Sequence, residues 1–187
     1  MVNIGGSKKM VQRIKVNLEA VEAMLYFWQA ASEKDNIPEK FFYDVAGMEA
    51  LSCAYDEEFN AESVRRALSA IKNREPFVGN KKERKFWNNN MWMMEDFEYT
   101  NAMVKPIKIL NLGDMVGKLI QGNSVNKYEE VEVIFAPLHS DEYIIKDNKL
   151  VINFFRVKPD LIDNKTYIAD KELNEYIEEK LNELISK

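Results

Sequence analysis

The spacing of the apolar residues changes near Tyr128, and this change limits the fold more than any other feature of the sequence. Before Tyr128, apolar residues recur at intervals of three and four, as on one face of an α-helix. After it, Val131, Val133 and Phe135 occupy every second position, as along a β-strand. The sequence therefore predicts an α+β fold, in which a mostly helical N-terminal half packs against a small C-terminal antiparallel sheet.

Four helices are expected in the first hundred residues. The first begins at a cap on Ser7 and extends over about 27 residues, because its apolar side chains form one continuous stripe. Pro38 suits the first turn of the second helix, and Asn60 is a good cap for the third. Asn80, followed three residues later by Glu83, resembles a capping box and predicts the start of the fourth helix.

The C-terminal part is expected to contain a hairpin and a closing helix. Asp147 and Asn148 accept positive φ and lie between two apolar segments, which predicts a tight turn between strands. Asp170 is expected to cap a last helix from about Lys171 to Ser186, with its apolar side chains on one stripe.

Two breaks are expected between these halves. Pro106 should interrupt any helix, and residues 107–112 fit a short strand or an extended crossing segment equally well, before a small helix over residues 113–121. Gly122, Asn123 and Ser124 are typical of a linker. The linker divides a helical portion, residues 1–122, from an α+β portion, residues 123–187, within one compact domain.

Residues Lys81–Thr100, KKERKFWNNNMWMMEDFEYT, concentrate aromatic, methionine and asparagine side chains. As a single helix they would place an apolar stripe toward the core, with Asn90 in its middle, so Asn90 is expected to be buried and hydrogen-bonded. Trp92 falls on the opposite face, where it either packs beneath another segment of the chain or anchors a ligand. The apolar stripe comprises Phe86, Trp87, Met94 and Phe97, and the residues around Trp92 are Asn88, Asn89, Glu95, Asp96 and Tyr99.

Composition limits the class of protein. With 46% hydrophobic residues the chain can form a substantial core, and its longest apolar run, residues 23–28, is far shorter than the ~20 residues of a membrane helix. The start of the sequence lacks an apolar signal region. A single cysteine, Cys53, excludes an internal disulfide and is expected to behave as a small hydrophobic residue. These features favour a cytoplasmic protein that is not associated with a membrane.

Few side chains are candidates for chemistry. The sequence contains no glycine-rich phosphate loop, HExxH, CxxC or GxSxG motif. His139, the single histidine, is expected in an exposed loop after a strand. As a catalyst it would need an acid or a nucleophile beside it. The nearby options are Ser140, Asp141 and Glu142, and the distant ones are Glu95 and Asp96. Carboxylates such as Glu95, Asp96 and Glu98 could assemble a magnesium or calcium site with acids elsewhere in the chain, but acids are common on any soluble surface.

Charge is unevenly distributed along the chain. Basic residues are concentrated between residues 65 and 85, whereas acidic residues outnumber basic ones from Tyr128 onward. Two such blocks commonly neutralise each other or stay solvated, but a basic block interleaved with aromatic residues is also typical of an anion-binding surface. The candidate anion-binding residues are Arg65, Arg66, Lys81, Lys82, Arg84 and Lys85.

Three functional hypotheses follow. The first is a regulatory module without catalytic activity or cofactor, in which Asn88, Asn89, Trp92, Glu95, Asp96, Tyr99 and His139 bind a small polar ligand or a protein partner. The second is an enzyme in which Glu95 or Asp96 acts with His139, as acid and base or around a divalent metal. The third is anion or nucleic-acid binding through the basic block, although a pI near 5.2 argues against nucleic acid.

Overall fold

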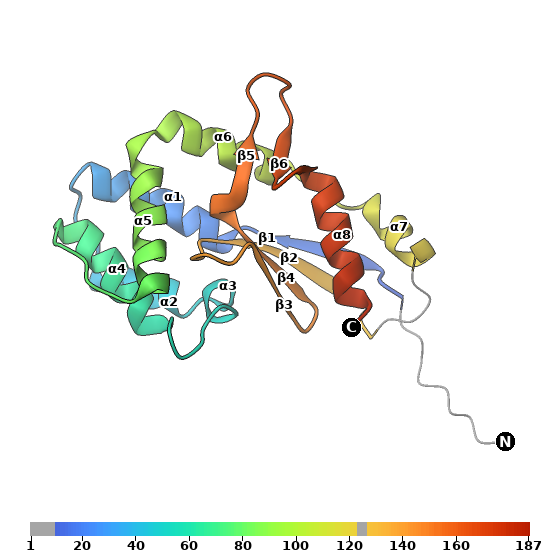
Figure 1. Cartoon of the computed structure of the whole chain (residues 1–187), viewed down its shortest axis with the longest axis horizontal. Coiled ribbons are helices and arrows are strands. Elements are labelled where there is room, and N and C mark those ends of the chain that lie inside the picture. The colour runs from blue at the N-terminus through green and yellow to red at the C-terminus, as the bar shows by residue number, and fades with distance from the viewer. Residues whose placement is uncertain (1–9, 123–126) are drawn as a thin grey trace.

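A mixed four-stranded sheet lies in the middle of the molecule, which a computed structural model describes over residues 10–122 and 127–187 (Figure 1). Its strand order is β1-β2-β4-β3; β2 runs parallel to both β1 and β4, and β3 runs antiparallel to β4. Residues 131–136 of β2 are buried without interruption, as expected for a strand covered on both faces. The strands are β1 (Arg13–Asn17), β2 (Glu130–Ala136), β3 (Tyr143–Lys146) and β4 (Lys149–Asn153).

Helices cover this sheet and extend to one side of it (Figure 1). α1 and α3 contact β2, and α8 contacts β4. α5 packs against α1 and α4, and together with α2 these helices form the part of the molecule at the left of Figure 1. The helices are α1 (Glu19–Ser32), α2 (Glu39–Ala46), α3 (Glu49–Ser52), α4 (Ala61–Asn73), α5 (Lys81–Glu95), α6 (Phe97–Lys108), α7 (Met115–Gly122) and α8 (Leu173–Ile185).

A second, three-stranded antiparallel sheet links the central sheet to α8. The chain leaves β4 through a 3-10 turn, η1 (Phe154–Arg156), and enters β5 (Val157–Pro159). The loop between β5 and β6 (Thr166–Ile168) projects from the body of the molecule at the top of Figure 1. After β7 (Lys171–Glu172) the chain continues directly into α8.

The fold has the α+β class that the sequence predicts. The capping boxes at Asn60 and Asn80 are both present, and a helix, α7, follows Gly113. The hairpin turn is also confirmed, with Asp147 in the left-handed region at a φ of 54°. α8 closes the chain, as expected from its apolar stripe.

The N-terminal helix prediction is wrong over residues 13–17, which form β1 instead. Ile14 and Val16 are half-buried, so these residues satisfy a period of two as well as the helical spacing. The side chain of Asn17 accepts a hydrogen bond from the backbone N–H of Glu19, and the helix begins there. The expected cap, Ser7, lies outside the described residues. β1 also changes the sheet, because it adds a strand that runs parallel to β2. The antiparallel pairing expected for the C-terminal strands holds for β3 with β4, whereas β2 runs parallel to β4.

Three further boundaries differ from the prediction. α6 continues through Pro106 to Lys108, which is possible because proline removes only one hydrogen bond near the end of a helix. Asp170 does not cap α8, since the next two residues pair with β6 before the helix begins. Gly122 ends α7, and the remaining residues of the expected linker, Asn123 and Ser124, lie outside the described ranges.

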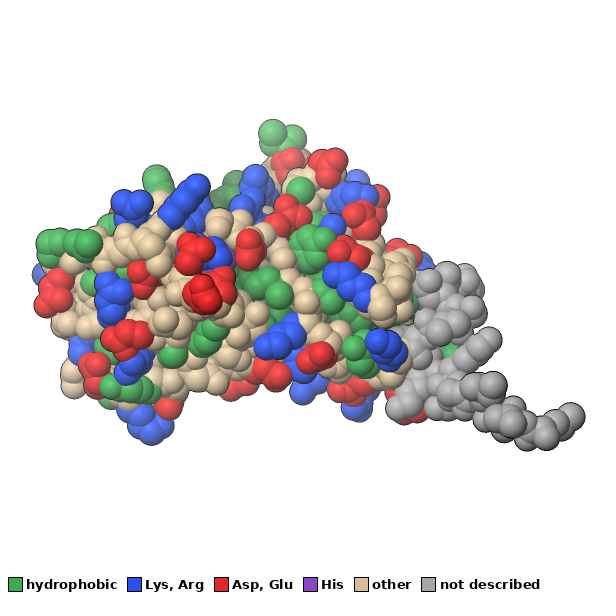
Figure 2. All heavy atoms as spheres, turned by 60° about the horizontal axis from the view of Figure 1, so that its bottom comes forward, with side chains coloured by type: hydrophobic (Ala, Val, Ile, Leu, Met, Phe, Trp, Pro, Cys, Tyr) green, Lys and Arg blue, Asp and Glu red, His purple; other side chains and the backbone are tan. Residues whose placement is uncertain are grey.

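The surface carries both signs of charge. Figure 2, which brings the lower side of Figure 1 forward, shows basic and acidic side chains interspersed over this face, and no histidine is visible on it. Within residues 10–122 and 127–187, every helix falls short of the length and apolar character that crossing a membrane requires.

Candidate functional site

The start of α5 is fixed by a reciprocal pair of hydrogen bonds. The side-chain oxygen of Asn80 accepts from the backbone N–H of Glu83 at 2.9 Å, and the Glu83 carboxylate accepts from the Asn80 N–H at 3.0 Å. The Asn80 amide also donates to the backbone oxygen of Glu58 at 2.6 Å. A Cβ at Gly79 would lie 2.9 Å from the Cβ of Glu83, so only glycine fits before this cap. The first turn of α5 is therefore held in one position.

The buried face of α5 fixes the rotation of the helix. Asn90 is fully buried; its side-chain oxygen accepts from the Trp28 indole N–H at 3.0 Å, and its amide donates to the Phe86 backbone oxygen at 2.9 Å. This confirms the prediction that Asn90 is buried and hydrogen-bonded. Because an unpaired amide in the core would cost roughly 1–3 kcal/mol, the pair with Trp28 strongly favours this single orientation of α5.

The stretch from Lys81 to Thr100 is not one helix, contrary to the prediction. Asp96 has extended backbone angles and its carboxylate accepts from the backbone N–H of Tyr99 at 3.0 Å, so it caps α6. An aspartate offers the backbone this local alternative to helix, and here the alternative prevails. Phe97 and Tyr99 therefore lie on α6 and do not extend the faces of α5.

The outward face of α5 is a continuous exposed stripe. Trp92 is 64% exposed, which overturns the alternative in which it packs inside the molecule. Lys81, Lys85 and Trp92 follow one another at intervals of four and seven residues, which at 100° per residue places them on one side of the helix. The exposed residues of α5 are Lys81, Arg84, Lys85, Asn88, Trp92 and Glu95, and we call them the α5 face.

A groove of about 560 Å³ lies against the first half of the α5 face. On one side, Phe77 stacks on Trp87 with ring centroids 6.1 Å apart and planes 11° from parallel. Ser140 also lines the groove, and its backbone oxygen accepts from the Arg156 guanidinium at 2.7 Å. The indole N–H of Trp87 is buried and finds no acceptor among the described residues. The residues that line the groove are Phe77, Lys81, Arg84, Lys85, Trp87, Asn88 and Ser140.

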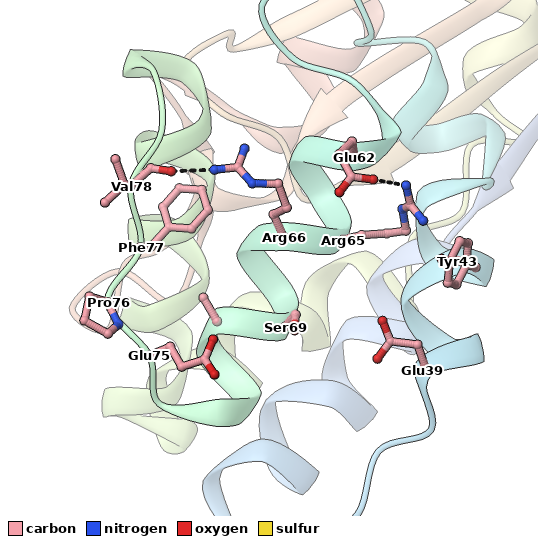
Figure 3. Close-up of a pocket in the computed structure, with 11 residues that line it drawn as sticks. Glu39, Tyr43, Glu62, Arg65, Arg66, Ser69, Glu75, Pro76, Phe77 and Val78 are labelled. Carbon is pink, nitrogen blue, oxygen red and sulfur yellow. Dashed lines mark hydrogen bonds and ion pairs between the residues drawn. The ribbon is translucent and has the colours of Figure 1, made fainter.

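The arginines of α4 are engaged within the chain (Figure 3). Arg65 pairs with Glu62, and its guanidinium lies 4.2 Å from the centre of the Tyr43 ring. Arg66 pairs with Glu83 at 2.9 Å and donates to the Val78 backbone oxygen at 2.5 Å. Both side chains thus tie α4 to its neighbours, and they stand beside a second pocket of about 460 Å³ over α4.

Lys82 is the third engaged cation of the basic block. Its ammonium lies 2.5 Å from the Asp56 carboxylate. This hydrogen bond raises the pKa of Lys82 and lowers the pKa of Asp56. The ion pairs of this block are thus formed with acids of the same half of the chain, and the described residues from Tyr128 onward contribute none of them.

The other three candidate cations have no such partner. Among residues 10–122 and 127–187, no carboxylate lies within 4.0 Å of the charged groups of Lys81, Arg84 or Lys85. All three belong to the first turns of α5, where the helix dipole adds further positive potential. The structure therefore separates the basic block into a paired half and an unpaired half, and the unpaired half lies on the α5 face.

His139 is buried, and the expectation of an exposed loop histidine is wrong. It is 1% exposed, and its ring packs on the Phe59 ring in a T-shaped arrangement with a centroid distance of 4.8 Å. Its Nδ1 accepts from the Ser140 backbone N–H at 2.8 Å, which places the ring proton of the neutral form on Nε2. Burial is the largest of the effects that lower the pKa of His139. The Nε2 atom has no partner among the described residues.

The loop containing His139 is held to α5, but through its backbone. Asn89 donates to the backbone oxygen of His139 at 3.2 Å, and Asn153 donates to the same oxygen at 3.0 Å. The hydrogen bonds of the described residues do not join the His139 side chain to Glu95 or Asp96. The structure thus brings together Asn89 and the His139 loop, while the two carboxylates lie at the opposite end of α5 from the groove.

The remaining candidates for chemistry are the Cys53 thiol and a possible metal site. Cys53 is half-buried, and burial is the main cause that raises the pKa of its thiol. A thiol of raised pKa is a poor nucleophile. In the part of the chain that the structure describes, no three histidine, cysteine or carboxylate side chains are grouped so that they could hold a metal ion.

The sequence could not place Ser140 beside α5. Ser140 is far from α5 along the chain, and only the tertiary fold brings it to the groove, where its backbone oxygen accepts a hydrogen bond from Arg156. Comparison with protein-family models, with curated proteins and with solved structures finds no match to this chain.

Proposed function

We propose that this protein is a binding module without catalytic activity, which holds an anionic ligand or partner on the α5 face. The observation that carries the proposal is the set of three unpaired cations, Lys81, Arg84 and Lys85, beside a groove with an aromatic wall. The proposal retains the cytoplasmic location expected from the sequence.

The three cations Lys81, Arg84 and Lys85 repel one another in the free protein. Lys81 lies three residues before Arg84 and four before Lys85, and like charges at these helical spacings destabilise by roughly 0.2–0.5 kcal/mol per pair. The positive end of the helix dipole adds to this cost. A bound anion would offset both effects. A surface that is only solvated would be more stable if acidic side chains were mixed with the basic ones. This physical conflict favours a ligand of negative charge.

The enzyme hypothesis receives less support. His139 is buried and its pKa is lowered, so at neutral pH it is uncharged and shielded from solvent. Its Nδ1 is already used by the backbone of Ser140. A general base must reach the proton that it removes, and this ring has no exposed edge to do so.

Heparin chromatography tests the proposal with two variants of equal charge. The first combines Lys81→Ala, Arg84→Ala and Lys85→Ala; the second combines Lys105→Ala, Lys108→Ala and Lys158→Ala, three exposed lysines on α6 and β5. We expect wild type to be retained at about 50 mM salt, and only the first variant to elute early, because three ion contacts are lost. Circular dichroism should show that both variants are folded. Early elution of both variants to the same extent, or no retention of wild type, would refute the proposal.

A further inference from the structure

We infer that the ligand of the α5 face is built of nucleotides, as in a single-stranded nucleic acid, with phosphates on the cations and an unpaired base on Trp92. The inference rests on the proposed function, since it needs the α5 face to bind anions. What it adds is the chemistry of the rest of the ligand, which comes from the aromatic and amide groups beside the cations.

The groove has room for a ring as well as for a charge. Its volume of about 560 Å³ lies within the range of roughly 300–1,000 Å³ that is usual for small-molecule sites. Phe77 and Trp87 form one wall as a stacked pair. An inorganic anion would leave this wall without a contact, whereas a nucleotide would place its base or sugar there. The groove therefore favours a ligand that joins an anionic group to an apolar ring.

The groups of the α5 face follow one another in the order that a short single strand requires. From Lys81 to Trp92 the helix advances by about 16 Å, at about 1.5 Å per residue. Cations occupy the first turns, Asn88 follows, and the exposed ring of Trp92 ends the row. The Asn88 side chain makes no hydrogen bond to any described residue, so its amide is available to the edge of a base. Trp92 then offers an open ring face for stacking.

Charge limits the length of strand that can bind. Beyond Trp92 the helix presents Glu95, and Asp96 and Glu98 follow it. These carboxylates would repel a phosphate chain, and the pI of 5.2 indicates that the rest of the protein offers little attraction. The site therefore fits a few nucleotides on one face rather than a long nucleic acid. A duplex fits less well, because its bases are already stacked on one another.

Four probes of the same protein separate the contributions of base and phosphate. These are an oligo(dT) of eight nucleotides, an abasic deoxyribose-phosphate oligomer of the same length, a duplex containing the oligo(dT), and free thymidine monophosphate. Binding is followed by tryptophan fluorescence at low salt. We expect oligo(dT) to bind about tenfold more tightly than the abasic oligomer, since stacking one base on an aromatic ring is worth roughly 1–3 kcal/mol, or about 5- to 100-fold.

Two variants locate the stacking contact. Trp92→Ala should lower the advantage of oligo(dT) over the abasic oligomer, because one stacking ring is lost, and should leave binding of the abasic oligomer unchanged. This variant should fold, because the side chain is mostly in solvent. Binding by this variant is followed by anisotropy of a labelled probe. Tyr26→Ala is the matched control: Tyr26 is an exposed aromatic residue on α1 whose ring packs on Phe41, and we expect no change in either affinity.

The outcomes distinguish this inference from the proposed function. Equal affinity for oligo(dT) and the abasic oligomer, lost in the triple alanine variant of α5, would overturn the inference and leave the proposed function standing. No binding of any polyanion would overturn both. Tighter binding of the duplex would also overturn the inference. If thymidine monophosphate binds as tightly as oligo(dT), the nucleotide chemistry of the ligand is supported. The ligand is then a free nucleotide and not part of a strand.

Discussion

Asn90 connects α5 to the core through one side-chain hydrogen bond with Trp28. Replacing it by leucine leaves the indole N–H buried without an acceptor, so we expect Asn90→Leu to lower the free energy of unfolding by about 1–3 kcal/mol. Adding Trp28→Phe removes the unpaired donor. A double-mutant cycle in urea should therefore show that the double variant is less destabilised than the sum of the two single variants. Strict additivity would show that the hydrogen bond contributes nothing to stability.

His139 should make stability depend on pH below about 6.5. Its pKa in the folded protein lies below the ordinary histidine value of about 6.5, so the unfolded chain takes up the proton first as pH falls. The stabilising contribution is complete above the unfolded pKa and declines as pH falls toward the folded pKa, by at most about 1.4 kcal/mol per pH unit. Because this is the single histidine of the chain, urea unfolding between pH 7.5 and 5.5 isolates it.

His139→Gln is the variant that tests this pH dependence. Glutamine does not titrate, and its side-chain oxygen can accept a hydrogen bond in place of Nδ1. We expect it to be less stable than wild type at pH 7.5 but to show a flatter profile down to pH 5.5. An equal slope in both proteins would contradict the prediction and point to carboxylates as the titrating groups.

At the residue scale, the angular position of a residue around its helix predicted whether some side chains are buried. It failed for side chains whose surroundings depend on the tertiary fold. It identified the burial of Asn90, because no other direction was open to a residue in the middle of an apolar stripe. It could not decide the environment of Trp92, which depends on whether another segment crosses α5. Burial of His139 was also beyond reach, since its neighbour Phe59 is eighty residues away in the sequence.

At the scale of elements, the α5 capping box depends on Gly79. A methyl group there would lie 2.9 Å from the Glu83 Cβ and 3.1 Å from the Phe77 ring. Gly79→Ala should therefore disrupt the cap and lower stability by about 1 kcal/mol, the usual loss for a helix cap. Gly117→Ala is the matched control, because a Cβ at that position on α7 meets nothing within 4 Å and alanine favours the helix by up to about 1 kcal/mol.

Urea unfolding compares the two glycine variants directly. We expect the midpoint to fall for Gly79→Ala and to stay unchanged or rise for Gly117→Ala. The groove should respond too, since Phe77 and the first turn of α5 both move when the cap is lost. Equal midpoints for the two variants would show that the cap tolerates a side chain at position 79.

Element boundaries were predictable where a side chain marks them and unpredictable where two patterns coincide. Asn60 and Asn80 mark the starts of α4 and α5 through local hydrogen bonds, and both caps are present. Asp96 is an equally good cap, but it lies inside a run with helical spacing, so the break between α5 and α6 was missed. β1 was missed for a related reason: Ile14 and Val16 satisfy both periods, and the partner strand begins more than a hundred residues later.

At the scale of the whole molecule, β1 joins the two portions expected from the sequence. It belongs to residues 1–122 and pairs along its length with β2, which belongs to residues 123–187. α1 also contacts β2. Neither portion can therefore complete the central sheet alone, and we expect the chain to unfold in a single cooperative transition.

Tryptophan fluorescence and circular dichroism test this cooperativity, because all three tryptophans lie between residues 28 and 92 whereas circular dichroism reports on every element. Ile177 is fully buried on α8, and Ile177→Ala should cost about 2–5 kcal/mol. If the sheet couples the two portions, this change in α8 must lower the urea midpoint seen by the distant tryptophans as much as the midpoint seen by circular dichroism. A fluorescence midpoint that stays at the wild-type value while the circular dichroism transition splits would show that the portions unfold independently.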